Sequence, residues 1–170
     1  MPSEYFATFA CYNAWANRRL YRACEALSEQ EYLRARPSAF GSIHGTLNHL
    51  LAADRIWIAR IEGRALPGAS LDQILYADLI GLKVARSAED AHLHNLVAGI
   101  SETMLDQPLI YRNPRGDRCG TPLRLVLGHL FNHQAEHRGE AEALLRQTQV
   151  APPPLDLIRF VEEQGAAPAC

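Results

Sequence analysis

The stretch His129-Leu-Phe-Asn-His133-Gln-Ala-Glu-His137-Arg-Gly139 places three histidines at intervals of four residues. It lies in a segment that runs from Pro122 to about Gln147 without a further proline, and this segment is predicted to be a helix. Thr121 is the predicted N-cap, with Pro122 at the first helical position, where a missing N–H is tolerated.

One face of this predicted helix forms a seam of residues spaced three and four apart: Leu123, Val126, Leu130, His133, His137, Glu140 and Leu144. His133 and His137 stand where leucines are expected, and His129 is one position off the seam. Two histidines at i and i+4 converge on one point, which is typical of half of a transition-metal site. The alternatives are histidines satisfied by polar neighbours or an ordinary solvated face. A metal also requires a third protein ligand from another element.

A second long helix is predicted from the N-cap Ser42 to Gly63, and it carries His44 and His49. Its deepest stripe consists of Ile43, Leu47, Leu50, Asp54, Trp57 and Ile61. His44 and His49 flank this stripe on opposite sides, so periodicity does not choose between them as the third ligand. Asp54 has three interpretations: a metal ligand, an acceptor for an imidazole N–H, or the partner of a nearby arginine.

The remaining sequence predicts an all-α four-helix bundle with short extra helices and a small hairpin before the last long helix. Further long helices are expected over about 3–26 and 78–106. Capping boxes predict a short helix at Ser28 and a short turn of helix at Ser70, and Asn113-Pro-Arg-Gly116 predicts the hairpin turn. A final short helix is expected over 155–163, with Leu155, Ile158 and Val161 packing onto the body. Residues 1–164 are interpreted as one domain and 165–170 as a disordered tail.

Composition narrows the class of protein. The chain has 170 residues, of which 48% are hydrophobic, and a net charge of −2. These values indicate a globular domain and give no basis for nucleic-acid binding. Neither a signal peptide nor a membrane span is predicted, so a cytoplasmic protein is expected. The four cysteines lack CxxC spacing and are interpreted as small core residues, except Cys170, which is expected to be frayed; a thiolate ligand or nucleophile is the alternative.

Three stretches resemble the DinB/YfiT-like family of bacterial metal-binding bundles: Tyr12-Asn-Ala-Trp-Ala-Asn-Arg-Arg-Leu20, Ser42-Ile-His-Gly-Thr-Leu-Asn-His-Leu-Leu-Ala-Ala-Asp-Arg-Ile-Trp57, and His129 to Gly139. The resemblance implies a bundle of up-down-down-up order that commonly forms homodimers. It also implies that His49, His133 and His137 hold a divalent metal, zinc or nickel, with an open coordination position. The family usually has glutamine or a similar polar residue where this chain has Glu140, so Glu140 is expected to line the pocket. His129, Asp54 and Arg138 are further candidates for the pocket or for residues that support the ligands.

The resemblance further implies a metal-dependent enzyme that acts on a small molecule. Family members of known activity are thiol S-transferases or thiol-dependent isomerases that use a low-molecular-weight thiol, and others are named metal-dependent hydrolases. The open position would serve a metal-bound water or thiolate. Arg138 and Arg55 are candidate partners for an anionic substrate, with surface ion pairs as the alternative.

Two other interpretations remain. His133-Gln-Ala-Glu-His137 matches the H-x-x-E-H signature of inverzincin proteases, in which Glu136 would be the general base. That class needs a further carboxylate ligand and a much larger mixed fold. The second alternative is a non-catalytic, stress-associated module whose ion merely ties two helices together.

Overall fold

The computed structural model describes residues 2–113 and 115–164. The tail predicted to be disordered, 165–170, lies outside these residues, as does Pro114 of the predicted hairpin turn. Within the described residues, no helix is both long and apolar enough to cross a membrane.

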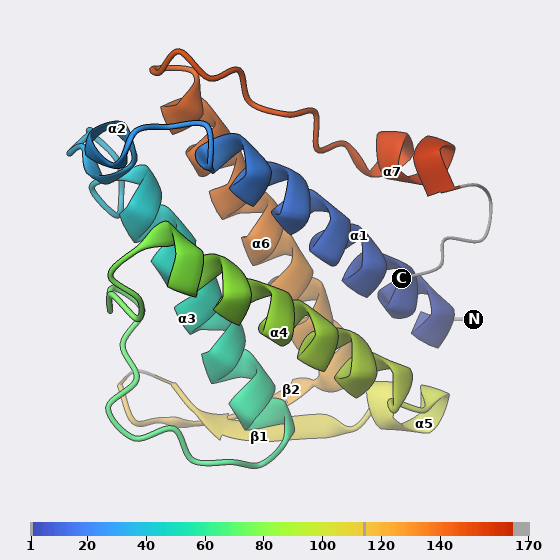
Figure 1. The fold of residues 1–170 in the computed structure, drawn as a ribbon. Coiled ribbons are helices and arrows are strands. Elements are labelled where there is room, and N and C mark those ends of the chain that lie inside the picture. The colour runs from blue at the N-terminus through green and yellow to red at the C-terminus, as the bar shows by residue number, and fades with distance from the viewer. Residues whose placement is uncertain (1, 114, 165–170) are drawn as a thin grey trace.

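Four long helices form the bundle: α1 (Pro2–Cys24), α3 (Ile43–Ile61), α4 (Leu79–Ala98) and α6 (Leu123–Leu145). In Figure 1, α3 and α4 both run opposite to α1, and α6 runs parallel to α1. The predicted up-down-down-up order is therefore confirmed. Because α3 and α4 point the same way, the chain between them, residues 62–78, must return along the bundle (Figure 1). This return loop passes the candidate site.

The shorter elements close the ends and one side of the bundle. They are α2 (Glu29–Leu33), α5 (Glu102–Leu105), β1 (Pro108–Arg112), β2 (Arg118–Pro122) and α7 (Leu157–Gln164). The two strands pair antiparallel, with Leu109 opposite Thr121 and Tyr111 opposite Cys119, which confirms the predicted hairpin. The hairpin lies across the end of the bundle where α3 ends and α6 begins, and α7 lies beside α1 (Figure 1).

Polar side chains start the helices as capping predicts. Ser28 accepts a hydrogen bond from the N–H of Glu31, and Ser42 accepts one from the N–H of Gly45. Each hydroxyl satisfies a backbone N–H that the first helical turn leaves without a partner. The N-caps predicted at Ser28 and Ser42 are confirmed.

Three local predictions are wrong. Thr121 does not cap α6, because it pairs with Leu109 in the hairpin. The helix begins at Leu123, with Pro122 at the N-cap position, and the N–H of Leu123 donates to the carbonyl of Gln107. The helix predicted over 78–106 stops at Ala98, with Gly99 at its C-cap, and resumes as α5. The predicted helix after Ser70 is a turn, because the Ser70 hydroxyl donates to the Asp72 carboxylate instead of capping a helix.

The core consists of two apolar clusters with a polar layer between them. One cluster includes Leu20, Leu47 and Leu144, and the other includes Ile58, Leu93 and Leu127. At mid-height each long helix contributes buried polar residues to the layer between the clusters: Asn13, Asn17, Asp54, Arg86, Asp90, Gln134 and Arg138. Cys24 belongs to the core, as expected. Ile158 does not pack onto the body; it is 68% exposed, and Phe160 is the buried residue of α7.

Candidate metal centre

The structure brings together the three histidines that the family resemblance selects. His49 comes from α3, and His133 and His137 come from successive turns of α6. One nitrogen from each ring lies within 4.8 Å of the other two, and the Nε2 atoms of His49 and His133 are 3.1 Å apart. Two imidazoles bound to one tetrahedral zinc would have nitrogens about 3.3 Å apart. The donor set therefore fits a transition-metal ion.

Hydrogen bonds on the far side of two rings fix which nitrogen faces the centre. The Nδ1 of His49 lies 2.7 Å from the carbonyl oxygen of Leu71, which can only accept, so Nδ1 carries the proton. The Nδ1 of His137 lies 3.0 Å from a carboxylate oxygen of Glu140. With Nδ1 as the donor, each ring presents its Nε2 to the centre, which is the usual arrangement behind metal-binding histidines.

Burial favours the neutral rings that a metal requires. His49 is 4% exposed, and burial lowers its pKa. Burial also lowers the pKa of His133 to about 4, with further lowering by His137, His49 and His129. At neutral pH these rings are unprotonated, and a metal would not have to displace a proton from them.

Phe40 covers one side of the centre. Its ring stacks on that of His49, with the ring centroids 3.7 Å apart, and meets His137 edge to face at 5.3 Å. Gly45 makes this placement possible, because a Cβ there would lie 2.0 Å from the Phe40 carbonyl oxygen. The N–H of Ala39 donates to Glu140 at 2.9 Å, so the same carboxylate holds both this loop and His137.

Asn48 supports the centre, although the sequence analysis assigned it no role. Its side chain is fully buried, and its carbonyl oxygen accepts the N–H groups of Leu75 (2.8 Å) and Tyr76 (3.0 Å). These bonds tie α3 to the return loop that presents the Leu71 carbonyl to His49. A polar residue directly before a candidate ligand, between Leu47 and Leu50 of the predicted apolar stripe, was the available sequence signal.

Leu123, Val126, Leu130 and Leu144 of the predicted α6 seam are buried, but between His133 and Glu140 the buried face is displaced by one position. His133 and His137 are half-buried, whereas the adjacent Gln134 and Arg138 are at most 2% exposed. Arg138 donates hydrogen bonds to Asn13 and to Gln134 within the polar layer. The alternative of a surface ion pair is therefore wrong for Arg138, and the histidines line the edge of the bundle instead of its centre. This edge position leaves the site accessible to small molecules.

Asp54 shows the ion-pair alternative among its three interpretations. Its carboxylate is 1% exposed and lies 2.7 Å from a guanidinium nitrogen of Arg86, which also contacts Asp90 at 3.0 Å. Burial alone would lower the pKa of Arg86, but Asp90 and Asp54 outweigh it and raise that pKa. Arg55 likewise pairs with a carboxylate, that of Glu89, at 3.0 Å.

Three further candidates, His44, His129 and Glu136, lie outside the group of three histidines. His44 lies 3.0 Å from the Tyr32 hydroxyl through its Nδ1, which satisfies that buried ring without a metal. His129 contacts the Trp57 ring edge to face at 5.0 Å and lines a cleft together with His133. Glu136, the general base of the protease alternative, is exposed to solvent.

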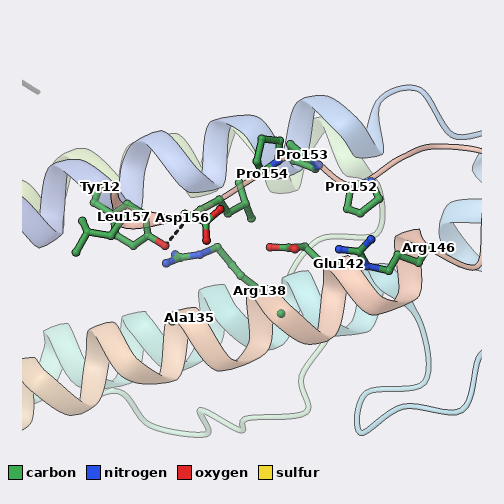
Figure 2. Close-up of a pocket in the computed structure, with 12 residues that line it drawn as sticks. Tyr12, Ala135, Arg138, Glu142, Arg146, Pro152, Pro153, Pro154, Asp156 and Leu157 are labelled. Atoms are coloured by element: carbon green, nitrogen blue, oxygen red, sulfur yellow. Dashed lines mark hydrogen bonds between the residues drawn. The ribbon is translucent and has the colours of Figure 1, made fainter. Parts of the chain in front are cut away.

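Two cavities are lined in part by residues of α6. A cleft of about 730 Å³ has His129 and His133 on its wall, between α3, the return loop and the hairpin. A second cavity of about 620 Å³ lies between α6 and the segment 152–157 (Figure 2). Figure 2 shows Glu142 and Asp156 near Arg138 there, with the Tyr12 hydroxyl bonded to the Leu155 carbonyl. Only the first cavity reaches a site histidine among its lining residues.

Fold and site together define a four-helix bundle with a histidine centre between its second and last long helices. The chain belongs to the DinB family, whose model matches residues 1–168. It is 30% identical to the DinB protein of Bacillus subtilis strain 168 over 149 residues, 85% of this chain and 87% of that protein.

Two crystal structures share the fold. A DinB-like protein from Bacillus cereus ATCC 10987 superposes with a TM-score of 0.64 at 13% identity, covering 82% of this chain and 90% of that one. A DinB-like protein from Bacillus subtilis superposes with a TM-score of 0.62 at 17% identity, covering 87% of this chain and 97% of that one.

Proposed function

We propose that the protein is a metal-dependent enzyme that acts on a small molecule, as a thiol S-transferase or a hydrolase. The observation that carries the proposal is the convergence of His49, His133 and His137, whose candidate ligand nitrogens lie within 4.8 Å of one another. Zinc and nickel are the proposed metals, because neutral imidazoles suit both.

Three protein ligands favour a catalytic site over a structural one, because structural zinc sites normally use four. A divalent ion held there would supply a Lewis acid with an open position for a small ligand. The chain's own residues prepare this position. The Leu71 carbonyl and Glu140 orient two of the rings, and Phe40 covers one side of His49.

The thiol and the homodimer are parts of the proposal that rest on the family resemblance, and a cytoplasmic location is proposed with them. A low-molecular-weight thiol fits the site chemically, because a divalent metal favours the thiolate over the thiol. Light scattering on the purified protein would test the dimer.

Metal content measured by mass spectrometry on protein purified without a histidine tag tests the site directly. About one divalent ion per chain is expected, and His49→Ala and His133→Ala should both lose it. His44→Ala, on the same helix as His49, is the matched control and should keep the ion. No bound ion, and no uptake of added zinc or nickel by a folded chain, would exclude the metalloenzyme.

Turnover separates the enzyme from the non-catalytic module. The metal-loaded protein would be incubated with a low-molecular-weight thiol and an electrophile, and separately with ester and amide substrates. Product formation that depends on both the metal and His133 would support the enzyme. A bound ion with no exchangeable position and no turnover would favour the module.

A further inference from the structure

The cleft beside the histidines has an aromatic wall. Trp57 of α3 meets Tyr111 of β1 edge to face, with ring centroids 5.2 Å apart, and meets His129 of α6 at 5.0 Å. Ile56 and Leu66 add apolar surface, and His133 connects this wall to the candidate metal centre. The hairpin therefore closes a cavity large enough for a small organic molecule.

The positively charged side chain of Arg60 lies on that wall. The guanidinium of Arg60 is 4.5 Å from the centre of the Trp57 ring and 5.0 Å from that of Tyr111, which places it against both rings. Its one hydrogen bond within residues 2–113 and 115–164 goes to the Arg112 carbonyl, and it makes no ion pair among them. Most of its N–H donors are thus free to meet a ligand.

The other charged groups of the cleft are already engaged. Arg64 pairs with Glu62, and the Asp72 carboxylate accepts the Ser70 hydroxyl. Burial lowers the pKa of Arg60, and among the described residues no carboxylate forms an ion pair with its guanidinium. An anion brought into the cleft would supply that compensation.

We propose that this cleft is the substrate site, and that it takes a molecule with a planar apolar body and one anionic oxygen group held by Arg60. This inference rests on the proposed function for the role of the metal centre. The rings of Trp57 and Tyr111 would contact the apolar body, and His133 places the bound molecule beside the centre. Arg60 then determines which substrates bind, without itself being a metal ligand.

The test compares two probes of similar shape, naphthalene-2-sulfonate and the uncharged methyl 2-naphthyl sulfone. A sulfonate is a weak metal ligand, so its binding reports on the cleft. Isothermal titration calorimetry would be run on zinc-loaded and on chelator-treated full-length protein. The sulfonate should bind about tenfold tighter than the sulfone in both forms, as one hydrogen-bonded charge pair provides. Arg60→Gln should remove this preference.

Arg19→Gln is the matched control, because Arg19 also lies over a tryptophan, Trp15 at 4.6 Å, but outside the cleft. It should leave the preference unchanged. Equal affinities for the two probes in the unmodified protein, or equal losses in the Arg19 and Arg60 variants, would overturn the inference. The unmodified protein alone decides the first point, so the test does not depend on a variant's folding.

The two proposals fail in different ways. A chain that takes up zinc but shows no sulfonate preference would overturn the cleft assignment and leave the metal function standing. A chain that takes up no zinc yet keeps an Arg60-dependent preference would overturn the metal function, and the cleft would then be an anion-binding site alone.

Discussion

Glu140 shows how one side chain can serve several parts of a site. Its carboxylate accepts from His137 through one oxygen and from the N–H of Ala39 through the other, so it orients a candidate ligand and anchors the loop that carries Phe40. The seam of α6 placed Glu140 near the pocket, but no sequence pattern could predict its bond to a loop a hundred residues away.

Replacing Glu140 by alanine should weaken zinc binding by about 10- to 100-fold, because the His137 ring loses the acceptor that fixes its orientation. Glu140→Gln should retain most of the affinity, since the amide oxygen can still accept. Competition with a chromogenic chelator would measure the affinities. Glu136→Ala, at an exposed carboxylate on the same helix, is the control. Equal affinities for the two alanine variants would contradict the orienting role.

Asp54 pairs with Arg86 and with none of the three site histidines, so its replacement should lower the stability of the fold without changing metal binding. Asp54→Asn should lower the free energy of unfolding by about 3 kcal/mol, because it leaves part of a buried charge without its partner. Metal content should stay at the level of the unmodified protein. Urea unfolding of chelator-treated protein and mass spectrometry would measure the two quantities, with exposed Asp72→Asn as the control. A lost metal with unchanged stability would instead make Asp54 part of the site.

At the scale of the elements, local signals predicted helix starts better than helix ends and loops. The caps at Ser28 and Ser42 depend on residues within one turn, and both are confirmed. The start of α6 was misplaced because Thr121 pairs with Leu109 in the hairpin, which local sequence does not reveal. Within the return loop, the capping-box spacing at Ser70 predicts a short turn of helix that does not form, because the Ser70 hydroxyl bonds Asp72.

The prediction for the elements concerns the return loop, residues 62–78. Asn48→Ala removes the acceptor for two loop N–H groups, and each such buried group left unpaired costs about 1–3 kcal/mol. The loop should then detach locally, so hydrogen exchange at Leu75 and Tyr76 should accelerate and zinc affinity should fall. Exchange in α1 should stay unchanged, as an internal control. Unchanged exchange in the loop would show that other contacts hold the Leu71 carbonyl in place.

For the whole molecule, the order of the helices determines which connecting segment lies beside the histidine centre. Helices α3 and α4 run in parallel, so the connection between them must travel the length of the bundle, and on its way it supplies the Leu71 carbonyl (Figure 1). Periodicity could predict four long helices, and the family resemblance supplied their order and the choice of His49 over His44. The shift of the buried face of α6 between His133 and Glu140 could not be predicted, because buried Gln134 and Arg138 belong to a polar layer formed by all four helices.

A metal held by His49 and by His133 and His137 would join α3 to α6, so its binding energy should appear as stability of the whole fold. At a free zinc concentration of about 100 times Kd, the gain is about 2.7 kcal/mol. For a chain of this size that corresponds to a rise in Tm of roughly 5–10 °C. Differential scanning calorimetry with zinc and with a chelator would measure it. His133→Ala should show no such rise, and an equal rise in both proteins would place the bound zinc elsewhere on the molecule.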